Sequence, residues 1–157
     1  MKLRNLIFSL LAGLGATSVH VALMEIKHRA EILPAFEPYD GLHRLLLPLM
    51  PQGMEPPLSW LIPDINGALI LGFVFGQLFI YLPGHSAVVK GAVFGFTAWL
   101  VLGLGLLPLT GGGLFGSGLG LGAWPALLMF MMLTIYSIVM SLLYAWLTTP
   151  RPVQRSS

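Results

Sequence analysis

The sequence predicts an all-α integral membrane protein with four transmembrane helices in an up-down-up-down bundle. Of its 157 residues, 56% are hydrophobic and only 9% are charged, which is too apolar for a soluble domain of this size. Four apolar runs each approach the roughly 20 helical residues that cross a bilayer. The acidic residues all fall in one proline-rich connector between the first and second runs. We therefore expect a single membrane domain over residues 1–157.

The first predicted span covers about residues 5–24 and follows two basic residues. A cleavable signal peptide opens in the same way, but this run is longer than the 7–15 residues of a usual signal core, so we expect a retained helix. Small residues on one side of the run predict a packing seam: Ala12, Gly13, Ala16 and Thr17. The helix should continue beyond the membrane, where Glu25 and Arg29, and likewise Lys27 and Glu31, stand four residues apart and can pair.

The outer connector, residues 25–64, contains seven prolines from Pro34 to Pro63, which exclude one long helix. Within it, the segment 41–50 is short and amphipathic. It fits an interfacial helix and, equally, an ordinary connector folded over the bundle.

The second and third predicted spans, residues 65–82 and 87–107, form a hairpin joined by Pro83–Ser86. Each carries two glycines four residues apart, and such pairs let helices approach closely. The predicted helix-packing residues are Gly72, Gly76, Gly91 and Gly95.

A glycine-rich outer loop, residues 109–123, precedes the last span, residues 124–148. The loop lacks the Lys-Ser/Thr ending of a phosphate-binding loop and misses the G-x-G-x-x-G spacing, so we expect no nucleotide there. A flexible or re-entrant loop dipping into the membrane interface fits its leucines and phenylalanine better. In the last span, Pro125 stands at a favoured first helical position. Thr134, Ser137 and Ser141 predict a small polar stripe that faces another helix.

The distribution of charge predicts the orientation. One set of segments carries basic residues and no acid: Lys2, Arg4, Lys90, Arg151 and Arg155. By the positive-inside rule this side is cytoplasmic. We therefore expect a multi-pass protein of the bacterial inner membrane with both termini in the cytoplasm.

His20, inside the first span, is a candidate cofactor ligand. A haem held by two helices needs a second histidine at similar depth, and the other histidines of the chain lie outside the spans. The competing interpretation is an interior histidine hydrogen-bonded to a neighbouring helix. A ligand shared with a partner subunit stays open.

A second candidate site lies in the connector, where Glu25 and His28, and then Asp40 and His43, each stand three residues apart. Such acid/His pairs on facing helices bind two metal ions in ferritin-like bundles. Charged connectors also contain this spacing by chance. We expect no cofactor, with a metal ion at these four residues as the alternative.

The function expected from the sequence is that of a non-catalytic accessory or structural subunit of a larger membrane complex. Span centres lack Asp, Glu, Lys and Arg, which mark ion paths in transporters, and no hydrolase or protease motif occurs, so no catalytic residue is predicted. Two alternatives stay open: a metal- or haem-dependent membrane oxidoreductase component using the outer acid/His cluster, and a small oligomeric carrier or channel. The expected partners are the lipid bilayer and other membrane subunits, without nucleic acid or nucleotide.

The whole pattern resembles, in outline, the small four-span bacterial inner-membrane proteins of unknown function that are loosely YagU-like. The resemblance rests on the basic start, the proline-rich connector, the glycine hairpin, and the glycine-rich loop before Trp124. It implies a fold and a location, and no functional residues follow from it.

Overall fold

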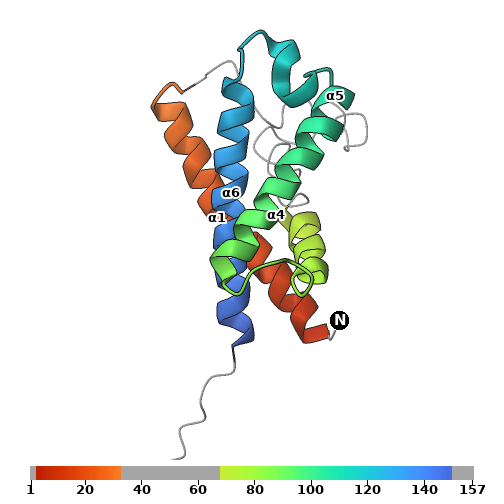
Figure 1. Ribbon diagram of the computed structural model, residues 1–157. Coiled ribbons are helices and arrows are strands. Elements are labelled where there is room, and N and C mark those ends of the chain that lie inside the picture. Colours follow the sequence, from red (N-terminus) through yellow and green to blue (C-terminus); the bar gives the residue numbers. More distant parts are fainter. Residues whose placement is uncertain (1–2, 33–67, 150–157) are drawn as a thin grey trace, which may run out of the picture.

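The computed structural model describes residues 3–32 and 68–149 (Figure 1). Its long helices are α1 (Leu3–Arg29), α4 (Ala87–Val101) and α6 (Trp124–Thr148). The α4 helix continues into the π-helix η2 (Leu102–Leu106) and the short α5 (Leu107–Leu109). A helix at Ala68–Leu78 and the 3-10 helix η3 (Leu114–Leu119) complete the described part, which contains no strand.

Three helices are long and apolar enough to cross a membrane: Leu3–Arg29, Ala87–Leu109 and Trp124–Thr148. The described residues therefore confirm an all-helical architecture with helices that could span a bilayer. The second predicted span stays a prediction, and with it the four-span bundle. Its described helix, Ala68–Leu78, rises about 16 Å at 1.5 Å per residue, roughly half of a 30 Å hydrocarbon core. The connector segment 41–50 lies outside the described residues.

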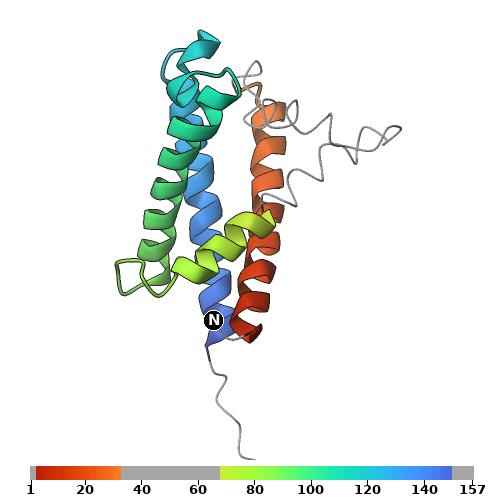
Figure 2. The same cartoon turned by 90° about the vertical axis from the view of Figure 1, so that its right-hand side faces the viewer.

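The α6 helix is the centre of the fold and packs against both α1 and α4. Figure 2 shows the Ala68–Leu78 helix running obliquely to these three, between α1 and α4. The start of α1, the turn before α4 and the end of α6 lie at one end of the molecule (Figure 1). The end of α1 and the glycine-rich loop lie at the other. The described part of the chain therefore places Arg4 and Lys90 at the same end, as the charge pattern predicts.

The first helix runs unbroken to Arg29, which confirms that it extends past its apolar part. Its end is closed by a left-handed residue, Glu31, with φ of 52°. The Glu31 N–H donates to the carbonyl of His28 (3.2 Å), and the Ile32 N–H donates to that of Lys27 (3.0 Å). This pair of bonds is a Schellman motif, which satisfies carbonyls that the helix itself leaves open. The predicted Glu25–Arg29 pair is confirmed, at 2.6 Å.

The hairpin turn begins earlier than expected, at Phe79 rather than at Pro83. Proline has no N–H, so Pro83 cannot donate to the carbonyl four residues before it, that of Phe79. The Lys90 amino group donates to this carbonyl instead (2.9 Å) and lies 4.3 Å from the centre of the Phe79 ring. Lys90 therefore closes the end of the preceding helix. Across the turn, the Ser86 hydroxyl caps α4 by accepting from the Val89 N–H (3.2 Å).

The third predicted span changes its hydrogen-bond pattern near its end. Pro108 again lacks a donor, and the turn before it widens to the π pattern, in which the Leu107 N–H donates to the carbonyl of Leu102. Gly103, inside this wider turn, is buried. Because Gly103 has no side chain, the Phe115 ring of the returning loop packs directly against the helix there.

Candidate functional site

The described part of the chain brings polar side chains together where α1 crosses α6, a place we call the polar crossing (Gly13, Thr17, His20 and Tyr136). The Tyr136 hydroxyl donates to the Gly13 carbonyl across the two helices (3.3 Å). The Thr17 hydroxyl donates to the same carbonyl (3.0 Å). The His20 ring meets the Tyr136 ring edge to face, with centroids 6.2 Å apart. Both rings are buried.

At the polar crossing, the Tyr136 hydrogen bond stabilises the contact between α1 and α6. In hydrocarbon, where water cannot replace a lost partner, an interhelical hydrogen bond contributes about 0.6 kcal/mol on average. His20 is buried and its ring contacts that of Tyr136, while the interpretation as a histidine hydrogen-bonded to a neighbouring helix stays a prediction. The other described histidines are exposed at opposite ends of the molecule, His28 in the last turn of α1 and His85 in the turn before α4 (Figure 1). These residues therefore bring no second histidine to the depth of His20, where a two-helix haem would need one.

A glycine contact joins α1 to the Ala68–Leu78 helix. A Cβ atom on Gly13 would lie 2.5 Å from the carbonyl oxygen of Ala68 and 3.1 Å from the Cα of Gly72. A Cβ atom on Gly72 would in turn lie 2.8 Å from the carbonyl oxygen of Ser9. Here two backbones touch with no side chain between them. Gly76, one turn further, is buried as well.

A second glycine contact joins α4 to α6. A Cβ atom on Gly91 would lie 2.6 Å from the Cα of Ile138, and one on Gly95 would lie 2.9 Å from the Cα of Thr134. The polar stripe on α6 faces this contact, which confirms that prediction. Its last member, Ser141, donates its hydroxyl to the carbonyl of Ala87 (2.6 Å).

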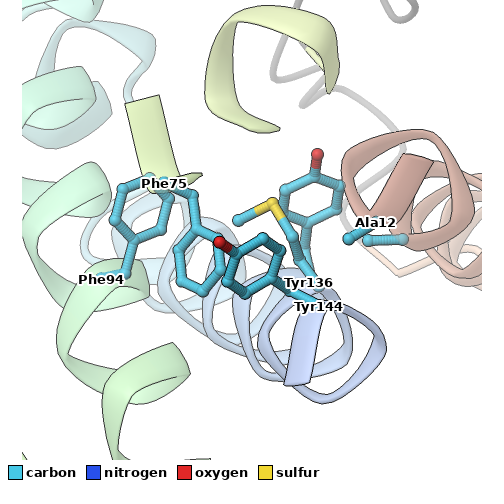
Figure 3. Close-up of a cluster of buried hydrophobic side chains, with 7 residues drawn as sticks. Ala12, Phe75, Phe94, Tyr136 and Tyr144 are labelled. Carbon is cyan, nitrogen blue, oxygen red and sulfur yellow. The ribbon is translucent and has the colours of Figure 1, made fainter. Parts of the chain in front are cut away.

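Aromatic rings fill the space between these contacts. Figure 3 shows Phe75 between Phe94 of α4 and Tyr144 of α6. The centroid distances from Phe75 are 5.1 Å to Phe94, 5.8 Å to Tyr144 and 5.3 Å to Phe79. The pairs are T-shaped, the arrangement that aromatic quadrupoles favour. Phe75 is completely buried.

The acid/His candidates for a metal site are only partly within the described residues. Glu25 is paired with Arg29, and His28 is exposed. Asp40 and His43 lie outside the described residues. In ranges 3–32 and 68–149, no group of three or more His, Cys, Asp or Glu side chains is placed to hold a metal ion.

We expect purified protein to contain no stoichiometric metal. The reason is that the Glu25 carboxylate is already paired with a guanidinium and the His28 ring is exposed. Metal analysis of the wild type and of His28→Ala should therefore agree, with His85→Ala as a control at the opposite end. Near-stoichiometric metal that disappears only in His28→Ala would establish the metal site.

Sequence reasoning missed two residues that hold the helices together, Tyr136 and Lys90. The signal for Tyr136 was available, because a tyrosine in the middle of an apolar span needs a hydrogen-bond partner. For Lys90 the signal was partial, since Pro83 leaves a carbonyl without a donor but does not say which side chain reaches it. Both depend on which segments meet in space, and spacing along one helix does not reveal that.

Comparison with known proteins places the chain in one group only. The model of a family described as a family of unknown function (DUF6789) matches residues 3–155. No curated protein and no solved structure matches the chain. The family match agrees with the expected resemblance to proteins of unknown function. The more specific YagU-like resemblance stays an expectation.

Proposed function

We propose that this chain, which belongs to the family of unknown function DUF6789, is a non-catalytic accessory subunit of a larger complex in the bacterial inner membrane. The proposal is based on the hydrogen bonds that polar side chains make between the described helices. It assigns the protein a structural role among other membrane subunits, with no cofactor of its own.

The observation that carries the proposal is that three polar side chains in the described helices each donate a hydrogen bond to the backbone of a neighbouring helix. Tyr136 donates to the Gly13 carbonyl and Ser141 to that of Ala87. The indole N–H of Trp99 donates to the carbonyl of Ala126 (3.0 Å). A side chain whose hydrogen bond holds two helices together cannot change partner with a substrate without loosening the fold. This favours a scaffold over an enzyme or a carrier.

The outward faces of the long helices offer the surface that such a subunit needs. Large apolar side chains are exposed along all three, including Leu11, Leu14, Phe96, Val101, Leu127, Met131 and Leu142. In a bilayer these side chains meet lipid or the helices of another protein. Close helix packing in lipid depends on shape, since lipid tails are as apolar as leucine.

The test is photo-crosslinking in intact membranes followed by gentle extraction. A photoreactive phenylalanine analogue at Leu142 on α6 and another at Leu11 on α1 should each crosslink to a defined protein, which mass spectrometry identifies. The same protein should co-purify with the wild type in stoichiometric yield. Lipid adducts alone at both positions, with the wild type extracted as a single species, would overturn the proposal. An absorption spectrum of the same preparation tests the haem alternative.

The proposed orientation has its own test, because the chain contains no cysteine. The substitutions His85→Cys and Ala30→Cys fall in exposed turns at opposite ends of the molecule (Figure 1). We expect an impermeant maleimide to label the Ala30→Cys variant from the periplasm and the His85→Cys variant only after the cytoplasmic face is opened. The cysteine-free wild type is the blank. Labelling of both from one side would contradict the topology.

A further inference from the structure

We propose that the glycine-rich loop and its flanking residues form a folded cap that inserts into the lipid interface. This glycine cap comprises residues 109–124. Its binding partner is the headgroup and acyl-chain boundary of the leaflet at that end of the bundle. The proposal rests on the fold of the cap, on which side chains it turns outward, and on its position at the ends of two membrane-length helices.

The glycine cap has a defined fold. The Gly112 N–H donates to the Leu107 carbonyl (2.8 Å), and the Gly118 N–H donates to the Gly112 carbonyl (2.9 Å). Gly113 and Gly116 have positive φ, at 72° and 85°, which glycine adopts without steric cost. These bonds close the loop upon itself and join it to the end of the α4–α5 helix.

Phe115 anchors the glycine cap from inside. Its ring lies 4.5 Å from the Trp99 ring, centroid to centroid. It also fills the space over Gly103, where an added Cβ atom would overlap the ring. The residue has φ of 51°, a left-handed conformation that is costly for a residue with a side chain. The contact with Trp99 and Gly103 offsets that cost and fixes which way the cap faces.

With Phe115 turned inward, the cap presents large apolar side chains on its outside. Leu109 is 79% exposed, Leu114 58%, Leu119 41% and Trp124 65%. Residues 91–150 contain no Asp, Glu, Lys, Arg or His. An apolar surface without a single charge is costly in water and suits the membrane interface, where Trp and Leu side chains anchor proteins.

The lengths of the adjoining helices place the cap at this depth. Ala87–Leu109 has 23 residues and Trp124–Thr148 has 25. At 1.5 Å per residue they rise about 35 and 37 Å, which is more than the 30 Å hydrocarbon core and less than the 40–45 Å that includes the headgroups. Both helices therefore end among the headgroups, and the cap between them lies in continuous contact with the bilayer that the helices cross.

The experiment uses nitroxide labels on the cysteine-free chain, reconstituted in phosphatidylcholine/phosphatidylglycerol vesicles. Labels at cysteines replacing Leu114 and Leu119 report on the cap. A label at Met131, exposed on α6, is the lipid reference, and one at His85, exposed in the opposite turn, is the water reference. Power saturation compares collision with oxygen, which is concentrated in lipid, and with a nickel chelate, which stays in water.

We expect both cap labels to favour oxygen over the nickel chelate by several fold, between the Met131 and His85 values. Circular dichroism confirms that each labelled variant is folded, and the two cap positions are independent of each other. Labels that read like His85 would place the cap in water. Labels shielded from both reagents would mean that protein, rather than lipid, covers the cap. Either result would overturn the proposal.

Discussion

Replacing Gly91 by alanine should lower the free energy of unfolding by about 1–3 kcal/mol, the usual cost of overpacking. The added methyl group would lie 2.6 Å from the Cα of Ile138 and 2.7 Å from the carbonyl oxygen of Ser137. Both atoms belong to the α6 backbone and cannot rotate away, so α4 and α6 must separate. The separation also stretches the Ser141–Ala87 hydrogen bond one turn away. Thermal unfolding in detergent, followed by circular dichroism, measures the loss.

The matched control is Gly105→Ala, further along the same helix, where a Cβ atom would have nothing within 4 Å. Alanine has a better helix propensity than glycine by about 0.8–1.0 kcal/mol, so this variant should melt at or above the wild-type temperature. If both variants unfolded alike, the α4–α6 contact would not be the close approach described.

Phe75→Ala should be the most destabilising of the aromatic substitutions. Phe75 is completely buried and contacts Phe79, Phe94 and Tyr144. Removing such a ring from a soluble core costs about 3–5 kcal/mol. We expect a loss at the lower end of that range, because lipid tails solvate an exposed phenylalanine as well as a protein interior does and only the packing is lost.

Phe73→Ala provides the comparison within the same helix. Phe73 is 45% exposed and directed away from the aromatic cluster. Its loss should change the midpoint of unfolding in sodium dodecyl sulfate little, while Phe75→Ala moves it strongly. Equal shifts for the two variants would show that the cluster around Phe75 does not stabilise the fold.

The elements that local chemistry determines were predictable from the sequence. The last helix runs over residues 124–148 as expected, because Pro125 favours its start and its apolar run has no interruption. In α1, Ala12, Gly13 and Ala16 are buried and Thr17 is half-buried, and the polar stripe of α6 faces α4. In each case one helical period decides which side chains share a face.

Features that depend on contacts between segments far apart in the sequence were not predictable in the same way. Composition alone cannot tell that the helix before the hairpin turn ends at Leu78, because Gln77 to Leu82 is as apolar as a span. The end of this helix is evident only from the fold, in which the Lys90 amino group donates to the Phe79 carbonyl. Similarly, the glycine-rich loop suggests flexibility by composition. Its order comes from Phe115 packing against Gly103, which is twelve residues earlier in the chain.

The charge-free stretch after Lys90 bears on how the protein enters the membrane during synthesis. Residues 91–150 include most of the Ala87–Leu109 helix, the glycine cap and the whole of α6, with no Asp, Glu, Lys, Arg or His to carry across. Moving a charged residue to the centre of a bilayer costs about 2.5–3.5 kcal/mol on the insertion scale. The stretch avoids that barrier entirely. It can therefore partition into lipid as one helical hairpin, with the positive charge of Lys90 at its starting end.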